Sequence, residues 1–138
     1  MANANVHKLH TLLQSLDTVM LTTIDDRYRL VSRPMVLRVE QFDGSLMLFA
    51  PVMSRVISHI AARAAVNVSF SSTERSLSLT GTADFTTDRD RVEDLWHDGL
   101  TPWLPRGPHG AAAIEVTIDE ARFWTVPGAL DESRWEAS

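Results

Sequence analysis

The sequence contains no cysteine, and this absence excludes several kinds of site at once. Without thiols the chain has no disulfide framework, no cysteine-bound zinc, no iron–sulfur cluster and no thiol nucleophile. It also lacks a glycine-rich phosphate loop, a His-Glu-x-x-His pattern and a serine nucleophile between two glycines. We therefore predict no metal site and assign a catalytic role to no residue, including the five histidines.

Long apolar runs are missing as well. No segment approaches the roughly 20 residues that a membrane helix needs, and the N-terminus lacks the pattern of a signal peptide. The net charge is −5, with 13 basic residues interleaved among 18 acidic ones, which argues against a nucleic-acid partner. We expect a cytoplasmic protein that does not bind membranes, with one domain over residues 1–138.

The remaining pattern predicts a mostly β domain. Apolar residues at helical spacing predict an opening helix that ends near Ser15, and Ser54 and a Thr87/Asp90 pair are predicted to cap two later helices. Asp43-Gly44 predicts a hairpin, Gly81 a bulge or close approach, and the tail after Pro127 a mobile segment. Strands are expected at 18–24, 30–39, 45–50, 66–70, 76–85 and 111–117, with a resumption at 121–126. Because these runs do not alternate with helices, they favour a small, mostly antiparallel barrel.

The strand at 30–39 carries a cation and a proline in its middle. Alternation places Arg33 on the same face as Val31, Met35, Leu37 and Val39, and an inward-facing charge needs a partner. Pro34 has no N–H group, so it indicates an edge strand or a bulge with free backbone groups nearby. Two interpretations stay open: a ligand uses these groups, or Arg33 pairs with an internal carboxylate and Pro34 protects the edge.

Two other segments suggest a ligand. Ser54-Arg55 lies at a predicted helix N-terminus, where free N–H groups, a hydroxyl and a guanidinium can bind a phosphate; an ordinary cap with a surface arginine is the alternative. Trp103 lies in a loop rich in proline, where stacking or a subunit contact is more plausible than packing in the core. Together with Arg33, these residues predict a pocket for a flat aromatic molecule with a phosphate tail.

These segments, in this order, resemble the FMN-binding split barrels related to pyridoxamine 5'-phosphate oxidase, in the general stress protein branch. The resemblance covers nearly the whole chain. It rests on Ser32-Arg-Pro-Met35, Leu46-Met-Leu-Phe49 before Ser54, Ser76-Leu-Ser-Leu-Thr-Gly-Thr-Ala83, Leu95-Trp96 with Trp103-Leu-Pro-Arg-Gly107, and Ala121-Arg-Phe-Trp124.

The resemblance implies a six-stranded antiparallel split barrel that forms a homodimer with two FMN sites between its subunits. It implies electron or hydride transfer to a small-molecule substrate that it does not name. Ser54 and Arg55 would hold the phosphate, and Trp103, from the partner subunit, would cover the ring. The cofactor-binding residues implied are Ser32, Arg33, Pro34, Met35, Phe49, Ala50, Ser54, Arg55 and Trp103.

The chain departs from the family pattern at the phosphate end. Ala50 and Val56 stand where such proteins carry a threonine and a lysine, which removes a hydroxyl donor and a charge. The segment Ser133-Arg-Trp-Glu136 does not match the substrate motif of true pyridoxamine 5'-phosphate oxidases, so we do not expect vitamin B6 oxidation. Two alternatives remain: a non-enzymatic, stress-related dimer without tight flavin binding, or another cofactor, such as a deazaflavin or haem, in the same cleft.

Overall fold

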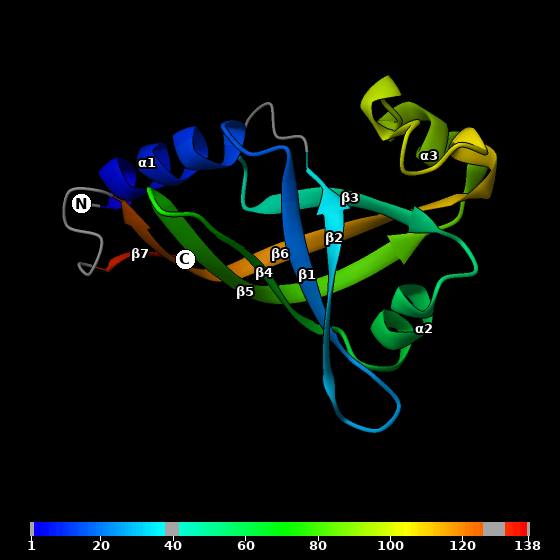
Figure 1. The fold of residues 1–138 in the computed structure, drawn as a ribbon, viewed down its shortest axis with the longest axis horizontal. Coiled ribbons are helices and arrows are strands. Elements are labelled where there is room, and N and C mark those ends of the chain that lie inside the picture. Colours follow the sequence, from blue (N-terminus) through cyan, green and yellow to red (C-terminus); the bar gives the residue numbers. More distant parts are fainter. Residues whose placement is uncertain (1, 38–41, 126–131, 138) are drawn as a thin grey trace.

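In the part of the chain that the structure describes, the protein is a curved antiparallel sheet with three α-helices packed at its margins (Figure 1). The computed structural model describes residues 2–37, 42–125 and 132–137. Two 3₁₀ turns, Asp98–Leu100 and Gly107–Gly110, lie between α3 and β6. The elements are α1 (Ala2–Gln14), β1 (Thr18–Ile24), β2 (Leu30–Val36), β3 (Ser45–Pro51), α2 (Arg55–Ala62), β4 (Ala65–Ser71), β5 (Arg75–Thr86), α3 (Arg89–Leu95), β6 (Ala111–Thr125) and β7 (Ser133–Glu136).

The strand order of the sheet is β2-β1-β4-β5-β6-β3, and β7 pairs with β6 beside this path. All of the pairings are antiparallel, and the sheet curves so that its two end strands, β2 and β3, approach each other. This confirms the predicted mostly β split barrel with flanking helices, with seven strands rather than six in the described part of the chain. None of the described helices is long and apolar enough to cross a lipid bilayer.

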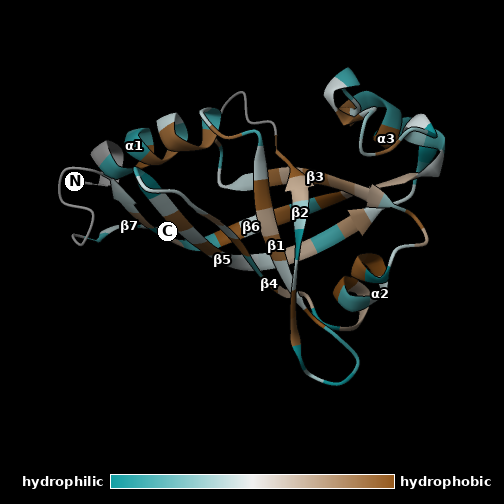
Figure 2. Ribbon diagram, viewed as in Figure 1, coloured by the Kyte–Doolittle hydropathy of each residue, from teal (hydrophilic) through white to brown (hydrophobic). Residues whose placement is uncertain are grey.

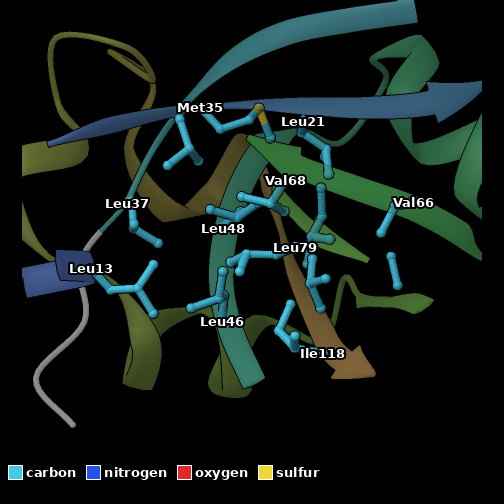
Figure 3. Close-up of a cluster of buried hydrophobic side chains, with 14 of the residues drawn as sticks. Leu13, Leu21, Met35, Leu37, Leu46, Leu48, Val66, Val68, Leu79 and Ile118 are labelled. Carbon is cyan, nitrogen blue, oxygen red and sulfur yellow. The ribbon is translucent and has the colours of Figure 1, made fainter. Parts of the chain in front are cut away.

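The core lies inside this curved sheet, where apolar side chains from the strands meet those of α1 and α2 (Figure 3). Leu21, Leu48 and Leu79 are fully buried, and Leu13 of α1 closes one end of the cluster. In β1 the buried residues alternate with more exposed ones, as expected for a strand with one face on the core. The period of the apolar pattern thus fixes which face of each strand points inward.

A second cluster lies under α3 and the loop that follows it. Phe49 of β3 packs with Val92, Leu100 and Leu104, and its ring meets the ring of Trp96 edge to face at 5.8 Å between centroids. Burying Leu100 and Leu104 anchors the proline-rich loop on both sides of Trp103. The loop is therefore held against β3 while the tryptophan itself stays half exposed.

Two predictions about connections were wrong. Asp43-Gly44 does form a turn, with Gly44 at φ +105°, but it does not join a hairpin, because β2 pairs with β1 and β3 pairs with β6. The two predicted runs at 111–117 and 121–126 are one strand, β6, as far as Thr125. Local turn chemistry says nothing about which distant strand completes the ladder.

Two further corrections concern ends of elements. The cap of α3 is Asp88 rather than Thr87, and its side chain makes no capping hydrogen bond. The tail predicted to be mobile includes β7, which pairs with β6 and carries Trp135 against Phe42 at 5.2 Å between ring centroids. Val39 and residues 126–131 lie outside the described residues.

Candidate functional site

Pro34 lies on β2, an edge strand of the sheet, as predicted. Along this strand Met35 is buried, Arg33 is half-buried and Pro34 is exposed. β2 pairs with β1 on one side and lies at the end of the strand order on the other. On that outer side the missing N–H of Pro34 costs no ladder hydrogen bond. The inward face of the strand therefore changes from apolar to cationic within two residues.

The guanidinium of Arg33 has a hydroxyl rather than a carboxylate as its partner. Its Nη1 donates to Oγ1 of the buried Thr23 at 2.9 Å, and that same oxygen lies 3.0 Å from Nδ1 of His59 on α2. Burial lowers the pKa of Arg33 below its ordinary value, although a guanidinium in a protein stays charged. No acidic side chain among the described residues forms an ion pair with it. Arg33 is thus a half-buried cation with capacity for an anion.

A narrow cleft of about 150 Å³ lies between β2, β3 and the loop after α3, and we call it the apolar pocket. It is smaller than the roughly 300–1,000 Å³ of most small-molecule sites, so it can enclose a flat group rather than a whole nucleotide. Its walls are mostly aliphatic and aromatic. The residues that line it are Arg33, Pro34, Met35, Val36, Phe49, Ala50, Pro51, Ser54, Val56, Leu100, Trp103 and Leu104.

Ser54 supplies an unusual polar atom to this pocket. It is the N-cap residue of α2, with φ −73° and ψ 154°, yet its side chain makes no capping hydrogen bond. Its Oγ is buried and has no hydrogen-bond partner among the residues that the structure describes. A buried hydroxyl without a partner is destabilising, and a ligand atom that bonded to it would remove that cost.

A larger cleft of about 790 Å³ adjoins the apolar pocket, and we call it the arginine pocket. It opens between α2 and the hairpin that joins β1 to β2. The tip of this hairpin is hydrophilic and extends past the sheet (Figures 1 and 2). The two pockets share Arg33, and Ser54 and Arg55, neighbours in the chain, line one pocket each. The lining residues are Ile24, Asp25, Asp26, Arg27, Arg29, Val31, Arg33, Arg55, Ser58, His59, Ala62 and Arg63.

The arginine pocket is strongly cationic in a protein with a net charge of −5. Among the described residues, five arginines line it, against two aspartates. One of those aspartates, Asp25, is already used by the hairpin, because its carboxylate accepts the backbone N–H groups of Arg27 and Arg29 and pairs with Arg29 Nε at 2.9 Å. The pocket therefore keeps an excess of positive charge and is suited to an anion.

The nine predicted cofactor-binding residues do not all lie in one place. Seven of them line the apolar pocket, and Arg55 lines the arginine pocket next to it. Ser32 points to the opposite face of β2, where its Oγ lies 2.5 Å from Oγ1 of Thr22, so its side chain lines neither pocket. Trp103 reaches the apolar pocket of its own chain; its contribution across a subunit interface stays a prediction.

Reasoning from the sequence missed much of the arginine pocket. Two adjacent aspartates in a turn are typical of solvated charge, but Asp25 is only 5% exposed and organises the hairpin. Arg27, Arg29 and Arg63 were given no role. Two arginines separated by one residue, after a pair of aspartates in a turn, were the available signal, whereas nothing in the sequence placed Arg63 near them.

Comparisons with known proteins agree with this architecture. Residues 4–134 match the family described as pyridoxamine 5'-phosphate oxidase like. A solved structure of a protein related to general stress protein 26, from Clostridium acetobutylicum, is 18% identical, with 99% of this chain and 96% of that chain covered and a TM-score of 0.83. No curated protein matches the sequence.

Two other solved structures extend the comparison. General stress protein 26 from Bacillus anthracis is 21% identical, with 95% of this chain and 96% of that chain covered and a TM-score of 0.69. A protein from Xanthomonas citri described as a general stress FMN/FAD binding protein is 25% identical, with 89% of each chain covered and a TM-score of 0.73. Since the family match spans residues 4–134, this chain belongs to the family of pyridoxamine 5'-phosphate oxidase-like proteins.

Proposed function

We propose that this chain binds a flavin nucleotide, FMN in its simplest form, and acts in the cytoplasm as a flavin-dependent oxidoreductase on a small molecule. The observation that carries the proposal is the junction of two unlike pockets at Arg33 and Ser54-Arg55. One pocket is narrow and apolar, and the other is wide and cationic. FMN has the matching shape, with a flat ring system at one end and a phosphate at the other.

The phosphate end of the proposed site has hydrogen-bond donors that can bind a ligand. Arg33 has no acidic partner among the described residues, and Ser54 Oγ is buried without a hydrogen bond. Arg55 begins α2 and lines the arginine pocket. A phosphate at this junction would gain charge-assisted hydrogen bonds from both arginines and complete the hydrogen bonding of Ser54.

The ring end of the site would be held by packing. Pro34 and Met35 of β2 and Phe49 of β3 line the apolar pocket, and Trp103, which is 51% exposed, lies at its margin. A flavin ring supplies hydride and electron transfer, and the protein orients it and excludes water from one face. β2 lies at the end of the sheet, and Pro34 has no N–H group with which to pair another strand. The neighbouring backbone groups on this edge of β2 are therefore available to the edge of the flavin ring.

A specific observation favours a second candidate function. Ala50 and Val56 both line the apolar pocket and are each 2% exposed, so neither position offers a donor to a phosphate. Each lost charge-assisted contact is worth about 1.5–3 kcal/mol, or roughly tenfold to a hundredfold in affinity. On this view the protein is a non-enzymatic dimer of the same fold with weak flavin affinity.

The absorption spectrum of the purified protein, followed by titration with FMN, separates the two functions. We expect flavin absorption bands in the protein as purified or, after removal of the flavin, saturable quenching of FMN fluorescence. A colourless protein that leaves FMN fluorescence unchanged would support the non-enzymatic dimer. Bands of a deazaflavin or of haem would identify another cofactor in the same cleft.

Replacement of Arg55 tests the phosphate contact. We expect Arg55→Ala to weaken FMN binding about tenfold or more, because it removes a charge-assisted contact. Riboflavin, which lacks the phosphate, should bind the variant and the wild type equally. Arg91→Ala is the matched control, since Arg91 is an exposed arginine of α3 that lines neither pocket. Equal FMN affinity in all three proteins would remove Arg55 from the site.

A further inference from the structure

The arginine pocket is larger and more highly charged than one phosphate requires. A monophosphate at the junction would contact Arg33, Ser54 and Arg55. Arg27, Arg29 and Arg63 would still line a cleft of about 790 Å³ with no anion assigned to it. That volume lies in the range of complete small-molecule sites. We propose that the arginine pocket binds the diphosphate group of a nucleotide.

The hairpin that carries two of these arginines is held in one conformation. Asp25 accepts hydrogen bonds from the backbone N–H groups of Arg27 and Arg29, each at 2.9 Å, and Tyr28 N donates to the carbonyl oxygen of Asp25. Tyr28 takes φ +62°, a conformation that this network supports. The backbone that carries the two arginines is therefore fixed before a ligand arrives, which lowers the entropy that binding must offset.

Arg63 is positioned from the opposite side of the cleft. Its Nη1 donates to the backbone carbonyl of Asp25, and its guanidinium stacks over the ring of Tyr28 with 4.0 Å between the guanidinium carbon and the ring centroid. These contacts leave other N–H groups of the guanidinium available to a ligand. Arginines on two elements facing one cleft suit two neighbouring phosphates, because each phosphate can be bound by a separate fork.

The rim of the pocket favours a nucleotide over inorganic diphosphate. Tyr28 does not itself line the pocket, but its ring is 75% exposed and lies beside Arg63, which does. Guanidinium planes and tyrosine rings both stack on nucleobases. Such a diphosphate has two sources. It can belong to a free nucleoside diphosphate, or to the distal half of a dinucleotide flavin whose ring lies in the apolar pocket. In the second case the inference rests on the proposed function.

The test measures binding by calorimetry at one fixed, low ionic strength. Flavin-free protein is titrated with ADP, inorganic pyrophosphate, FMN and FAD, and ADP is also titrated into protein saturated with FMN. The variants are Arg27→Gln and Arg63→Gln, with Arg91→Gln as the matched control. We expect Arg27→Gln and Arg63→Gln each to weaken binding of the nucleotide diphosphate about tenfold or more. Both variants should bind FMN with nearly the wild-type affinity. Arg91→Gln should bind every ligand with nearly the wild-type affinity.

The titrations also identify the source of the diphosphate. ADP binding to FMN-saturated protein, with FAD bound no more tightly than FMN, indicates a free nucleotide. FAD binding that is tighter than FMN binding, with the gain lost in Arg27→Gln, indicates the dinucleotide flavin. If the wild-type protein binds ADP but binds neither FMN nor FAD, the proposed function is contradicted and the inference about the arginine pocket is not. The inference is overturned if Arg27→Gln and Arg63→Gln affect neither ADP nor FAD, or if pyrophosphate binds as tightly as ADP.

Discussion

Asp25 decides the conformation of a whole hairpin through a single buried carboxylate. The backbone N–H of Arg29 holds the pKa of Asp25 below its usual value, and the N–H of Arg27 and the guanidinium of Arg29 lower it further, against the opposing effect of burial. The carboxylate is thus needed in its charged form. Arg27 and Arg29 reach the arginine pocket only while this turn is intact.

The lowered pKa of Asp25 predicts a pH dependence of stability. Because the folded-state pKa lies below that of the unfolded chain, its contribution is complete above the unfolded value of about 3.9 and is lost as the pH falls through the folded value. We expect urea denaturation between about pH 6 and pH 2.5 to show a smaller acid-induced loss in Asp25→Asn than in the wild type. Asp26→Asn, at an exposed aspartate in the same turn, should keep the wild-type loss. Identical profiles for Asp25→Asn and the wild type would contradict this role.

At the scale of elements, the pairing of β5 with β6 depends on the close approach of Gly81 to the backbone of Thr117. Their register shifts between Thr80 and Gly81, so that β6 carries one extra residue, Asp119, at a bulge. A Cβ atom at position 81 would lie 2.0 Å from the carbonyl oxygen of Thr117. Since the clash is with backbone, a rotamer change cannot relieve it. The bulge predicted at Gly81 is confirmed.

Adding one methyl group at this bulge should therefore be costly. We expect Gly81→Ala to reduce the free energy of unfolding by about 1–3 kcal/mol, the usual range for overpacking, as measured by urea denaturation. Gly110→Ala is the control, because its Cβ would meet Arg106 Cβ at an ordinary 3.4 Å. If the two variants proved equally stable, the close approach at Gly81 would not limit the pairing of β5 and β6.

For the whole molecule, the homodimer implied by the family resemblance is a prediction that a surface feature supports. Met53 is 91% exposed, and it lines a further cleft of about 260 Å³ together with the half-exposed Trp103. Exposed apolar side chains next to a binding pocket are typical of an interface. A second copy that covered them would also close the apolar pocket.

Light scattering coupled to gel filtration measures this directly. We expect a mass of twice the 15.4 kDa chain, because one copy leaves the apolar margin in water. Met53→Asp should shift the protein toward a single chain, since it would bury a charge in the interface. A matched Thr11→Asp change, at an exposed position of α1, should leave the mass unchanged. A wild-type mass of 15.4 kDa would refute the dimer.

The features that the sequence determined by itself are local ones. The alternation of apolar residues fixed the strands and their inward faces, and Pro34 indicated an edge because a missing N–H group is a property of the residue itself. Strand-like runs that do not alternate with helices were sufficient to predict the fold class, and three residues proposed from the sequence, Arg33, Ser54 and Trp103, line one pocket. None of this required knowledge of which strands pair.

Only the tertiary structure decided what lies beside what. It paired β3 with β6 rather than with β2, and it brought Arg63 of the α2 C-terminus to the hairpin at Asp25, 38 residues away in the chain. It also turned an aspartate that reads as solvated into a buried organiser of the arginine pocket. Strand pairing and charge clustering depend on contacts between distant residues, and those contacts are set by the packing of the whole core, which no short stretch of sequence contains.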